Sequence, residues 1–260
     1  MLKEKYDNLK NHIKNIGSVV AFSGGVDSTL LLKVCSDVLK ENVLAMMVIA
    51  PYTPKWEVEV AKVLIKEFGV KYKFIKVEMI EEIRFSPRNR CYICKNDIFT
   101  KIKEEAKAEG IYNILDGTNF DDIKDYRPGI KALEELNIIS PFFVNEFTKI
   151  DIRNLSKQLN LKTWNKPAYA CLLSRIPYGQ EVIERELERI EAAEVYLMGL
   201  GFIGVRVRNH AGLARIEISK KYFVDILNKK KLEKISVKLK EFGFKYVTLD
   251  LEGYKMGSLN

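Results

Sequence analysis

The sequence lacks the long apolar runs that membrane proteins need. No uninterrupted apolar stretch approaches the roughly 20 residues of a membrane-spanning helix. The N-terminal stretch MLKEKYDNLKNHIKNIG is charged and amphipathic, and it has no apolar core of the kind that signal peptides carry. We therefore expect a soluble, cytoplasmic protein with no membrane partner.

Cysteine is also scarce, with only four among 260 residues, which is too few for a protein held together by disulfides. Cytosolic thiols stay reduced, which disfavours a disulfide further. Cys91 and Cys94 form a C-x-x-C pair, and Cys171 lies far from them in the sequence. A zinc site, an iron–sulfur cluster and a reactive sulfur all remain open. The fourth cysteine, Cys35, lies on the apolar face of a predicted helix, in the stretch LLLKVC, and is expected in the core.

Acidic residues are fewer than basic ones. The 43 Lys and Arg residues outnumber the 35 Asp and Glu residues and give a formal net charge of +8. This balance suits an anionic partner such as a nucleotide, a phosphorylated metabolite or RNA. A lysine-rich surface without a specific anion would give the same charge.

Strand and helix patterns alternate through the first part of the chain. We expect buried strands at 18–22 and 43–50, where β-branched and apolar residues dominate, an alternating strand at 72–79, and a fourth strand that ends in a turn at 112–119. Helical spacing lies between them, including a helix over about 94–109. This order predicts an α/β fold with a doubly wound parallel sheet, in which ligands bind at the carboxyl ends of the strands.

The pattern changes near residue 166. A long helical stretch is followed by two short alternating runs, GVRVRNH and ARIEIS, then a lysine-rich helical stretch (220–242) and a last strand, YVTLDLEG. We expect a smaller C-terminal α+β domain over 166–260, after a first domain over 1–165, with the linker at about 160–178.

The stretch AFSGGVDSTLLL is the most informative motif. Two glycines directly after a strand let the backbone N–H groups face an anion, and the next helix adds its N-terminal dipole. The Walker motif G-x-x-x-x-G-K-[ST] is absent. The stretch instead resembles the S-G-G-x-D-S loop of PP-loop ATP pyrophosphatases, which cleave ATP between its α- and β-phosphates.

That resemblance implies ATP and Mg²⁺ as the cofactors of the loop. Asp27 would hold Mg²⁺ or orient the pyrophosphate, and Ser23 would share the catalytic role. Backbone amides after the second strand, in VIAPYTP, would meet the adenine, although an ordinary strand-end turn has the same pattern. The expected nucleotide contacts are Ser23, Gly24, Gly25, Val26, Asp27, Ser28 and Ala50.

The two alternating runs of the C-terminal part place charged side chains on one sheet face. Side chains alternate with a period of two, so Arg206, Arg208 and His210 share a face, as do Arg215 and Glu217. Arginine forks suit phosphate and carboxylate groups. A solvated sheet face would show the same alternation.

Further stretches resemble the LarE family, sulfur transferases of the PP-loop class. They are RCYICK (90–95), DGTNFDDIKDYRPG (116–129), WNKPAYACLLSRIPYG (164–179), RVRNHAGLARIE (206–217) and LEGYKMGSLN (251–260). The resemblance implies an enzyme that adenylates a carboxylate of pyridinium-3,5-biscarboxylic acid mononucleotide and replaces an oxygen with sulfur. The product feeds nickel-pincer nucleotide biosynthesis, and family members form homo-oligomers.

The family resemblance gives the cysteines a role. In single-cysteine members the residue matching Cys171 gives up its sulfur and becomes dehydroalanine. This sequence also has Cys91 and Cys94, as in the three-cysteine subgroup, which implies that the three hold a [4Fe–4S] cluster carrying an exchangeable sulfide. Zinc on three thiolates and a sacrificial Cys171 stay open.

Other residues receive roles from the resemblance. Arg175 would meet a substrate anion near Cys171, and Glu194 and Asp225 match acidic positions of the substrate or metal region. With the sheet face, the expected substrate-binding set is Arg175, Arg206, Arg208, Arg215, Glu217, Glu194 and Asp225. The stretch that follows the fourth strand would bind Mg²⁺, gate the site or form a capped, solvated loop; its residues are Asp121, Asp122, Asp125 and Arg127.

Two other functions remain open. A PP-loop tRNA thiolase with an iron–sulfur cluster would suit the charge and the C-x-x-C pair, but the sequence has no added zinc-ribbon pairs and no aromatic-basic platform for single-stranded RNA. We therefore expect no nucleic-acid partner. An ATP-binding regulator or metal carrier would leave the pyrophosphatase loop unexplained.

Overall fold

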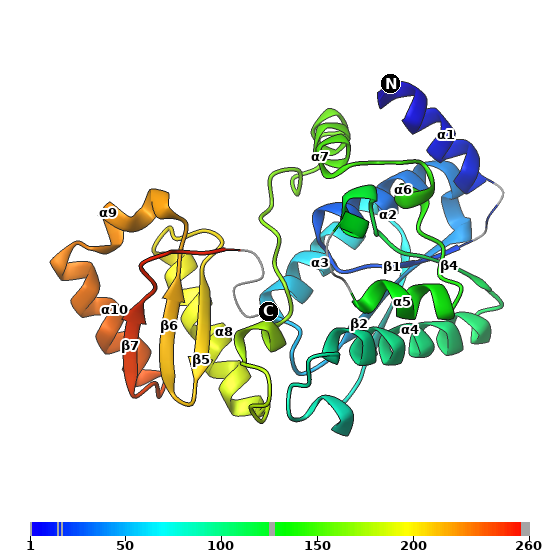
Figure 1. Ribbon diagram of the computed structural model, residues 1–260. Helices are drawn as coiled ribbons and strands as arrows, with labels where there is room; N and C mark the ends of the chain where they lie inside the picture. The colour runs from blue at the N-terminus through cyan, green and yellow to red at the C-terminus, as the bar shows by residue number, and fades with distance from the viewer. Residues whose placement is uncertain (1, 15, 17, 125–127, 256–260) are drawn as a thin grey trace. The chain divides into compact units, whose positions relative to one another are not determined.

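The computed structural model describes residues 2–14, 16, 18–124 and 128–255, and this part of the chain forms two compact units (Figure 1). The first unit comprises Met1–Ala50, Lys55–Glu78 and Asn89–Lys166. The second unit comprises Pro51–Pro54, Met79–Arg88 and Pro167–Asn260. The second unit thus takes two short segments from the earlier part of the chain as well as the C-terminal part.

The first unit contains a parallel sheet with the strand order β3-β2-β1-β4. Its strands are β1 (Ser18–Ala21), β2 (Val43–Ile49), β3 (Lys71–Lys76) and β4 (Asn113–Leu115). All three strand pairs are parallel, which confirms the α/β fold predicted from the alternating pattern. The carboxyl ends of β1 and β4 therefore lie at one edge of the sheet, beside each other.

Helices cover both faces of this sheet. They are α1 (Leu2–Lys14), α2 (Val26–Leu39), α3 (Lys55–Phe68), α4 (Arg90–Ala108), α5 (Pro128–Glu135), α6 (Pro141–Val144) and α7 (Lys149–Gln158). Short 3₁₀ turns follow at η1 (Lys40–Asn42) and η3 (Phe120–Lys124). One core joins the sheet to α1, α2, α3 and α7, and a second core joins its other face to α4 and α5.

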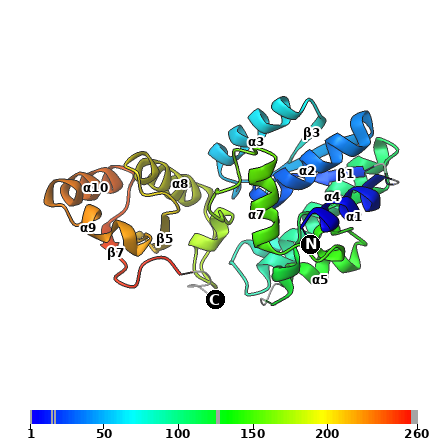
Figure 2. The ribbon, with the colours of Figure 1, turned by 90° about the horizontal axis from the view of Figure 1, so that it is seen from above.

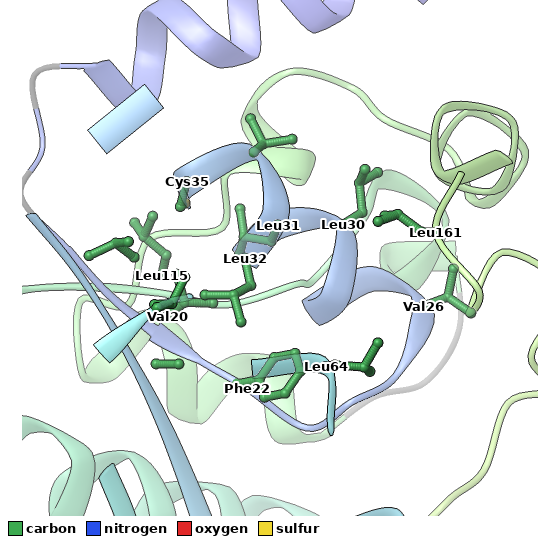
Figure 3. Packing of buried hydrophobic residues seen from close by; sticks show 14 of the residues in the cluster. Val20, Phe22, Val26, Leu30, Leu31, Leu32, Cys35, Leu64, Leu115 and Leu161 are labelled. Carbon is green, nitrogen blue, oxygen red and sulfur yellow. The ribbon is translucent and has the colours of Figure 1, made fainter. Parts of the chain in front are cut away.

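β1 and β2 are buried on both faces because their side chains alternate between the two cores, whereas the edge strand β3 is partly exposed. Val20 of β1 packs into the core around α2, whereas Val19 packs into the core around α4. Figure 3 shows the first of these cores, with Leu30 and Leu31 of α2 among its side chains. Cys35 lies in it and is fully buried, so its predicted core position is confirmed.

The second unit contains a three-stranded sheet with the order β5-β6-β7. Its elements are η2 (Glu81–Ile83), η4 (Leu172–Arg175), α8 (Glu184–Gly199), β5 (Arg206–His210), β6 (Leu213–Glu217), η5 (Lys220–Tyr222), α9 (Phe223–Ile226), α10 (Lys229–Glu241) and β7 (Tyr246–Leu249). β5 and β6 are antiparallel, and β7 runs parallel to β6. The predicted smaller α+β fold is confirmed, with α8 and α10 side by side (Figure 2).

Two elements differ from the sequence expectation. α4 begins at Arg90 rather than near 94, so Cys91 and Cys94 lie in its first turns. The lysine-rich stretch is not one helix, because Asn228 interrupts it and its side chain accepts a hydrogen bond from the Lys231 N–H at the start of α10. No helix in the described ranges has the length and hydropathy to cross a membrane.

Candidate functional site

The loop between β1 and α2 has a backbone that only glycine adopts without strain. Gly24 has φ +69°, in the left-handed region, and a Cβ built on it would lie 3.3 Å from the Ala61 Cβ of α3. Gly25 is the N-cap of α2 and has no side chain to cap the first turn. The N-terminal N–H groups of α2 are therefore left for an external acceptor, as at phosphate-binding helix termini.

Two hydroxyl groups line the same loop. The Ser23 and Ser28 Oγ atoms lie 3.0 Å apart, and the Ser23 N–H donates to Ser28 Oγ at 3.3 Å. Ser28 Oγ also lies 3.4 Å from the Gly25 carbonyl oxygen, which it meets as a donor. The hydroxyls thus hold the turn closed and present polar groups where α2 begins.

Asp27, in the first turn of α2, connects the loop to two later parts of the chain. Asn119 Nδ2 donates to Asp27 Oδ1 at 3.3 Å, and Lys149 Nζ at the start of α7 forms an ion pair with Asp27 Oδ2. A Cβ at Gly117 would lie 3.1 Å from the Asp27 Cβ. The end of β4 therefore packs directly against the phosphate loop, as the parallel topology predicts.

Lys166, the last residue of the first unit, braces the loop from the other side. Its Nζ donates to the Gly24 carbonyl oxygen at 2.9 Å and lies 3.5 Å from Glu57 Oε1. It also lies 5.3 Å from the centre of the Trp56 ring. Sequence reasoning missed both Lys166 and Lys149, since each is more than 100 residues from the loop.

The acidic residues after β4 accept hydrogen bonds from backbone N–H groups, one nearby and one at the start of α7. The Asp122 carboxylate accepts from the Asn119 N–H at 3.1 Å, and the Asp121 carboxylate accepts from the Lys149 N–H at 2.8 Å. Of the readings from the sequence, these bonds favour the capped loop over a Mg²⁺ site. Asp125 and Arg127, which belonged to the same prediction, lie outside the described residues.

These groups have the chemistry that a nucleoside triphosphate site requires. Backbone N–H groups, two hydroxyls and two lysines would meet phosphate oxygens, and Asp27 is the carboxylate beside them. One protein carboxylate together with phosphate oxygens is a donor set that Mg²⁺ accepts, so the residues fit this ion. Of the predicted contacts, Ser23 to Ser28 lie together here, and Ala50 directly follows β2.

In the second unit, Cys171 is the N-cap of η4 and is partly exposed. Four residues on, Arg175 is fully buried and forms a bidentate ion pair with Glu194 of α8, at 2.8 and 2.9 Å. Its Nη1 donates to the carbonyl oxygens of Ala170, at 2.7 Å, and Cys171, at 3.1 Å. Burial by itself would lower the pKa of Arg175. The attraction of the Glu194 carboxylate, with smaller contributions from Cys171 and Tyr254, is greater than the effect of burial, so the pKa is raised and the guanidinium stays charged.

The predicted charged face of β5 and β6 exists. Arg206 lies opposite Glu217, and Arg208 lies opposite Arg215, on the same face of the antiparallel pair. Because Arg206 and Arg208 are only 2% and 4% exposed, the alternative of a solvated face is wrong for these two residues. The Glu217 carboxylate accepts two hydrogen bonds from Arg208, one from Nε and one from Nη2, and a third from Arg215 Nη2.

The remaining predicted residues, His210 and Asp225, are less buried than the arginines of β5. His210 is half-buried, and burial lowers its pKa, with Arg215 and Arg208 adding to the effect. Asp225 of α9 is exposed and forms an ion pair with Lys231. The structure therefore brings Arg175, Glu194 and the β5–β6 residues to the neighbourhood of Cys171 and gives Asp225 a surface partner.

The three cysteines expected to bind a cluster are divided between the units. Cys91 is exposed and Cys94 partly exposed in the first unit, whereas Cys171 belongs to the second. Within the described ranges, no three His, Cys, Asp or Glu side chains are gathered as a metal site. Thiolates are the ligands that iron–sulfur clusters require, and all three of these thiols are exposed or partly exposed, so the residue types fit such a cluster.

The loop, its helix and the parallel sheet define a PP-loop ATP-utilising enzyme. The sequence profile of the NAD synthase family matches residues 1–107. The pyridinium-3,5-bisthiocarboxylic acid mononucleotide synthase of Lactiplantibacillus plantarum is 36% identical over 244 residues, which cover 93% of this chain and 88% of that protein. The chain belongs to the LarE family of ATP-dependent sulfurtransferases, which confirms the resemblance of its motifs.

Two further relatives match over nearly the whole chain. An uncharacterized protein of Synechocystis sp. is 38% identical over 263 residues, covering 100% of this chain and 98% of that protein. An uncharacterized protein of Methanocaldococcus jannaschii is 36% identical over 249 residues, covering 96% and 95%. The similarity thus includes residues 167–260 of the second unit, which lie beyond the residues that the NAD synthase profile matches.

Proposed function

We propose that the protein converts a carboxylate of pyridinium-3,5-biscarboxylic acid mononucleotide into a thiocarboxylate, for nickel-pincer nucleotide biosynthesis. The observation that carries this proposal is the 36% identity to a synthase of the bisthiocarboxylic product, over 93% of the chain. The match extends through the second unit, where Cys171 and the arginines lie. A PP-loop alone would supply carboxylate activation without specifying the substrate.

The first step is adenylation of the substrate. A carboxylate oxygen attacks the α-phosphorus of ATP, the bond to the bridging oxygen breaks, and pyrophosphate leaves. The N–H groups of Gly24 to Ser28 and the two serine hydroxyls bind phosphate oxygens, and Lys149 and Lys166 balance their charge. Asp27 would hold Mg²⁺, which neutralises the departing pyrophosphate.

The second step is replacement of AMP by sulfur. A sulfur nucleophile attacks the acyl carbon, and the bond between that carbon and the AMP oxygen breaks. We propose that Cys91, Cys94 and Cys171 hold a [4Fe–4S] cluster that supplies an exchangeable sulfide when bound. In the alternative, the Cys171 sulfur itself is transferred, and each chain acts once.

We propose that the substrate lies beside Cys171, near the charged face of β5 and β6. Arg215 is the least buried arginine of this face, with its side chain 28% exposed, and is the one best able to reach an anion. A cytoplasmic location and a homo-oligomeric state belong to the same proposal. They rest on the family resemblance.

The test is an anaerobic reaction with ATP, Mg²⁺, sulfide and the pyridinium substrate. We expect AMP and pyrophosphate to form only when the substrate is present, and mass spectrometry to detect oxygen-to-sulfur exchange in the product. The proposal would be overturned in favour of a tRNA thiolase if ATP turnover did not depend on the pyridinium substrate but increased with tRNA, and if sulfur appeared in the tRNA.

A further inference from the structure

Three arginines of the second unit donate to the main chain of one short segment, residues 168–174, which we name the Cys171 segment. Arg206 Nη2 donates to the Ala168 carbonyl oxygen, and Arg208 Nη1 donates to the Ser174 carbonyl oxygen. Arg175 Nη1 donates to the carbonyl oxygens of residues 170 and 171, at 2.7 and 3.1 Å. Donors from β5 and η4 thus fix the segment on both sides of the cysteine.

Each guanidinium is itself held in place. Glu194 binds Arg175 through two nitrogens, and Glu217 binds Arg208 through two nitrogens at 3.1 and 2.8 Å. Arg206 lies 4.9 Å from the ring centre of Tyr169 and 5.0 Å from that of Tyr254. The three arginines are no more than 4% exposed. Buried, bidentate pairing leaves these side chains little freedom to move.

Every guanidinium nitrogen of Arg175 and of Arg208 already donates to the protein. A substrate anion that took over one of these bonds would displace a buried carboxylate or a carbonyl oxygen. Leaving such a group without its partner is costly, so this arrangement suits holding the protein chain better than binding a ligand.

The segment needs such support because it has no regular structure of its own before η4. Residues 167–171 form neither helix nor strand, so their carbonyl oxygens gain no partners from a ladder of backbone hydrogen bonds. The Ser174 hydroxyl adds a bond to the Cys171 carbonyl at 2.9 Å and accepts one from Arg175 at 2.7 Å.

We infer that Arg175, Arg206 and Arg208 are positioning residues for Cys171, acting through the carbonyl oxygens of its segment rather than through contact with the substrate. This inference rests on the proposed function only where Cys171 takes part in sulfur transfer.

The first test needs no substrate. Ser174→Ala, Arg175→Lys, Arg206→Lys and Arg208→Lys are compared by site-resolved alkylation of the complete chain at one pH. We expect the alkylation rate of Cys171 to change by at least about threefold in each variant, because its segment loses a bond that fixes it. Cys91 and Cys94 in the same molecules should react as in wild type. Arg185→Lys, at an exposed position of α8, is the matched control.

The second test separates positioning from binding. In the lysine variants, the Kd of the pyridinium substrate and the rate of pyrophosphate release should stay within about twofold, while sulfur transfer slows about tenfold or more. A Kd raised about tenfold, with Cys171 alkylation unchanged, would make the arginines direct ligands and overturn the inference.

Ser174→Ala removes a single hydroxyl and keeps the test decisive if a buried arginine variant does not fold. Wild-type Cys171 reactivity in this variant and in every arginine variant that folds would also overturn the inference. If the wild-type enzyme fails to activate the pyridinium substrate, the proposed function fails, but the alkylation result still decides the positioning role.

Discussion

Asp27 joins the phosphate loop, the end of β4 and the start of α7 through its two carboxylate oxygens. Asp27→Asn keeps the size of the side chain but removes its charge, and with it the attraction for Lys149 and for a divalent cation. We expect pyrophosphate release to fall at least about a hundredfold, in the range seen when one charge-stabilising group is lost from an active site. Rapid-quench measurement of pyrophosphate checks this.

Asp37→Asn is the matched control for Asp27→Asn. Asp37 lies on the same helix, α2, and its exposed carboxylate pairs with Lys33 in a surface ion pair. Such pairs contribute little, so this variant should keep wild-type activity. Full activity in Asp27→Asn would refute the assignment of the loop as a pyrophosphatase site.

Because of Cys35, the free energy of unfolding of the first unit should decrease as the pH rises in the alkaline range. Burial raises its pKa to about 12 from 9.0, so the folded protein retains a proton that the unfolded chain loses. The stabilising effect is complete below pH 9 and is lost as the pH rises towards 12. Cys35→Ala should lower the free energy of unfolding relative to wild type, because it leaves a cavity. This difference between the two proteins should be about 1–2 kcal/mol smaller at about pH 10.5 than at about pH 8.

Urea unfolding at the two pH values measures this difference. Val34→Ala also makes a cavity in the core around α2 but removes no titrating group, so its cost should be the same at both pH values. An equal cost for Cys35→Ala at both pH values would contradict the buried, neutral state of this thiol.

At the residue scale, sequence patterns identified local motifs but not distant partners. Ser23 to Ser28 are contiguous, so their chemistry could be predicted from one stretch. Lys149 and Lys166 reach the same loop only because the chain returns there after β4 and after α7. No spacing rule connects a lysine to a loop more than 100 residues earlier.

At the scale of elements, the turn between β1 and α2 depends on its distance from α3. Gly24→Ala places a methyl group in the left-handed region and against Ala61, whereas Gly69→Ala has the same backbone strain with no neighbouring atom within 4 Å. The strain alone costs about 1–2 kcal/mol in either variant. We expect Gly24→Ala to cost about 1 kcal/mol more than Gly69→Ala in thermal unfolding, because α3 must shift.

This pair of glycine variants also has a functional readout. Gly24→Ala should weaken ATP binding, since the loop N–H groups move with the turn, and Gly69→Ala should not. Equal stability and equal ATP affinity in the two variants would show that the contact with α3 does not shape the loop.

Lys166 is the brace of the same turn. Lys166→Met removes a charge-assisted bond to the Gly24 carbonyl, an interaction of about 1.5–3 kcal/mol. We expect ATP binding about tenfold weaker or more, measured by calorimetry. Lys162→Met, which loses an exposed ion pair with Glu67, is the control and should bind ATP normally; the idea of a brace fails if the two variants behave alike.

The charged strands show what periodicity can and cannot predict. Alternation correctly placed Arg206, Arg208 and Arg215 on one face, because the side-chain period of a strand is fixed. It could not predict that this face is covered by a segment without regular structure, or that Glu194 of α8 would bind Arg175. Tertiary packing determines both.

At the scale of the whole molecule, the strand and helix order predicted both folds. Which residues belong to the second unit could not be predicted in the same way. Residues 51–54 and 79–88 join it although they precede the end of the first unit in sequence, and a linear pattern cannot show such an exchange. The Leu172 N–H donates to the Tyr52 carbonyl at 2.9 Å, which ties one of these segments to η4.

The cluster proposal is tested on the intact chain. Protein purified without oxygen should contain about four irons per chain, the content of one [4Fe–4S] cluster. Cys91→Ala, Cys94→Ala and Cys171→Ala should each reduce the iron content and the visible absorbance, and Cys35→Ala, the buried control, should not. With sulfide supplied, the wild-type enzyme should turn over repeatedly while the mass of Cys171 stays constant.

The outcome that contradicts the cluster is equally clear. Conversion of Cys171 to dehydroalanine in proportion to product, in iron-loaded protein, would restore the sacrificial role. Loss of iron from the Cys35→Ala variant alone would show that the binding residues were assigned wrongly.

The bonds that hold the Cys171 segment have a consequence for molecular evolution. Apart from the bond to the Ser174 hydroxyl, the arginine bonds to the segment end on main-chain oxygens, which every amino acid supplies, so substitutions at Ala168 or Ala170 leave the acceptors in place. The donor residues cannot be replaced in the same way, because only arginine has the planar, forked guanidinium group. Among descendants of a common ancestor, we expect the side chains of the segment to drift while the arginines persist, with Glu194 and Glu217 inherited alongside their partners.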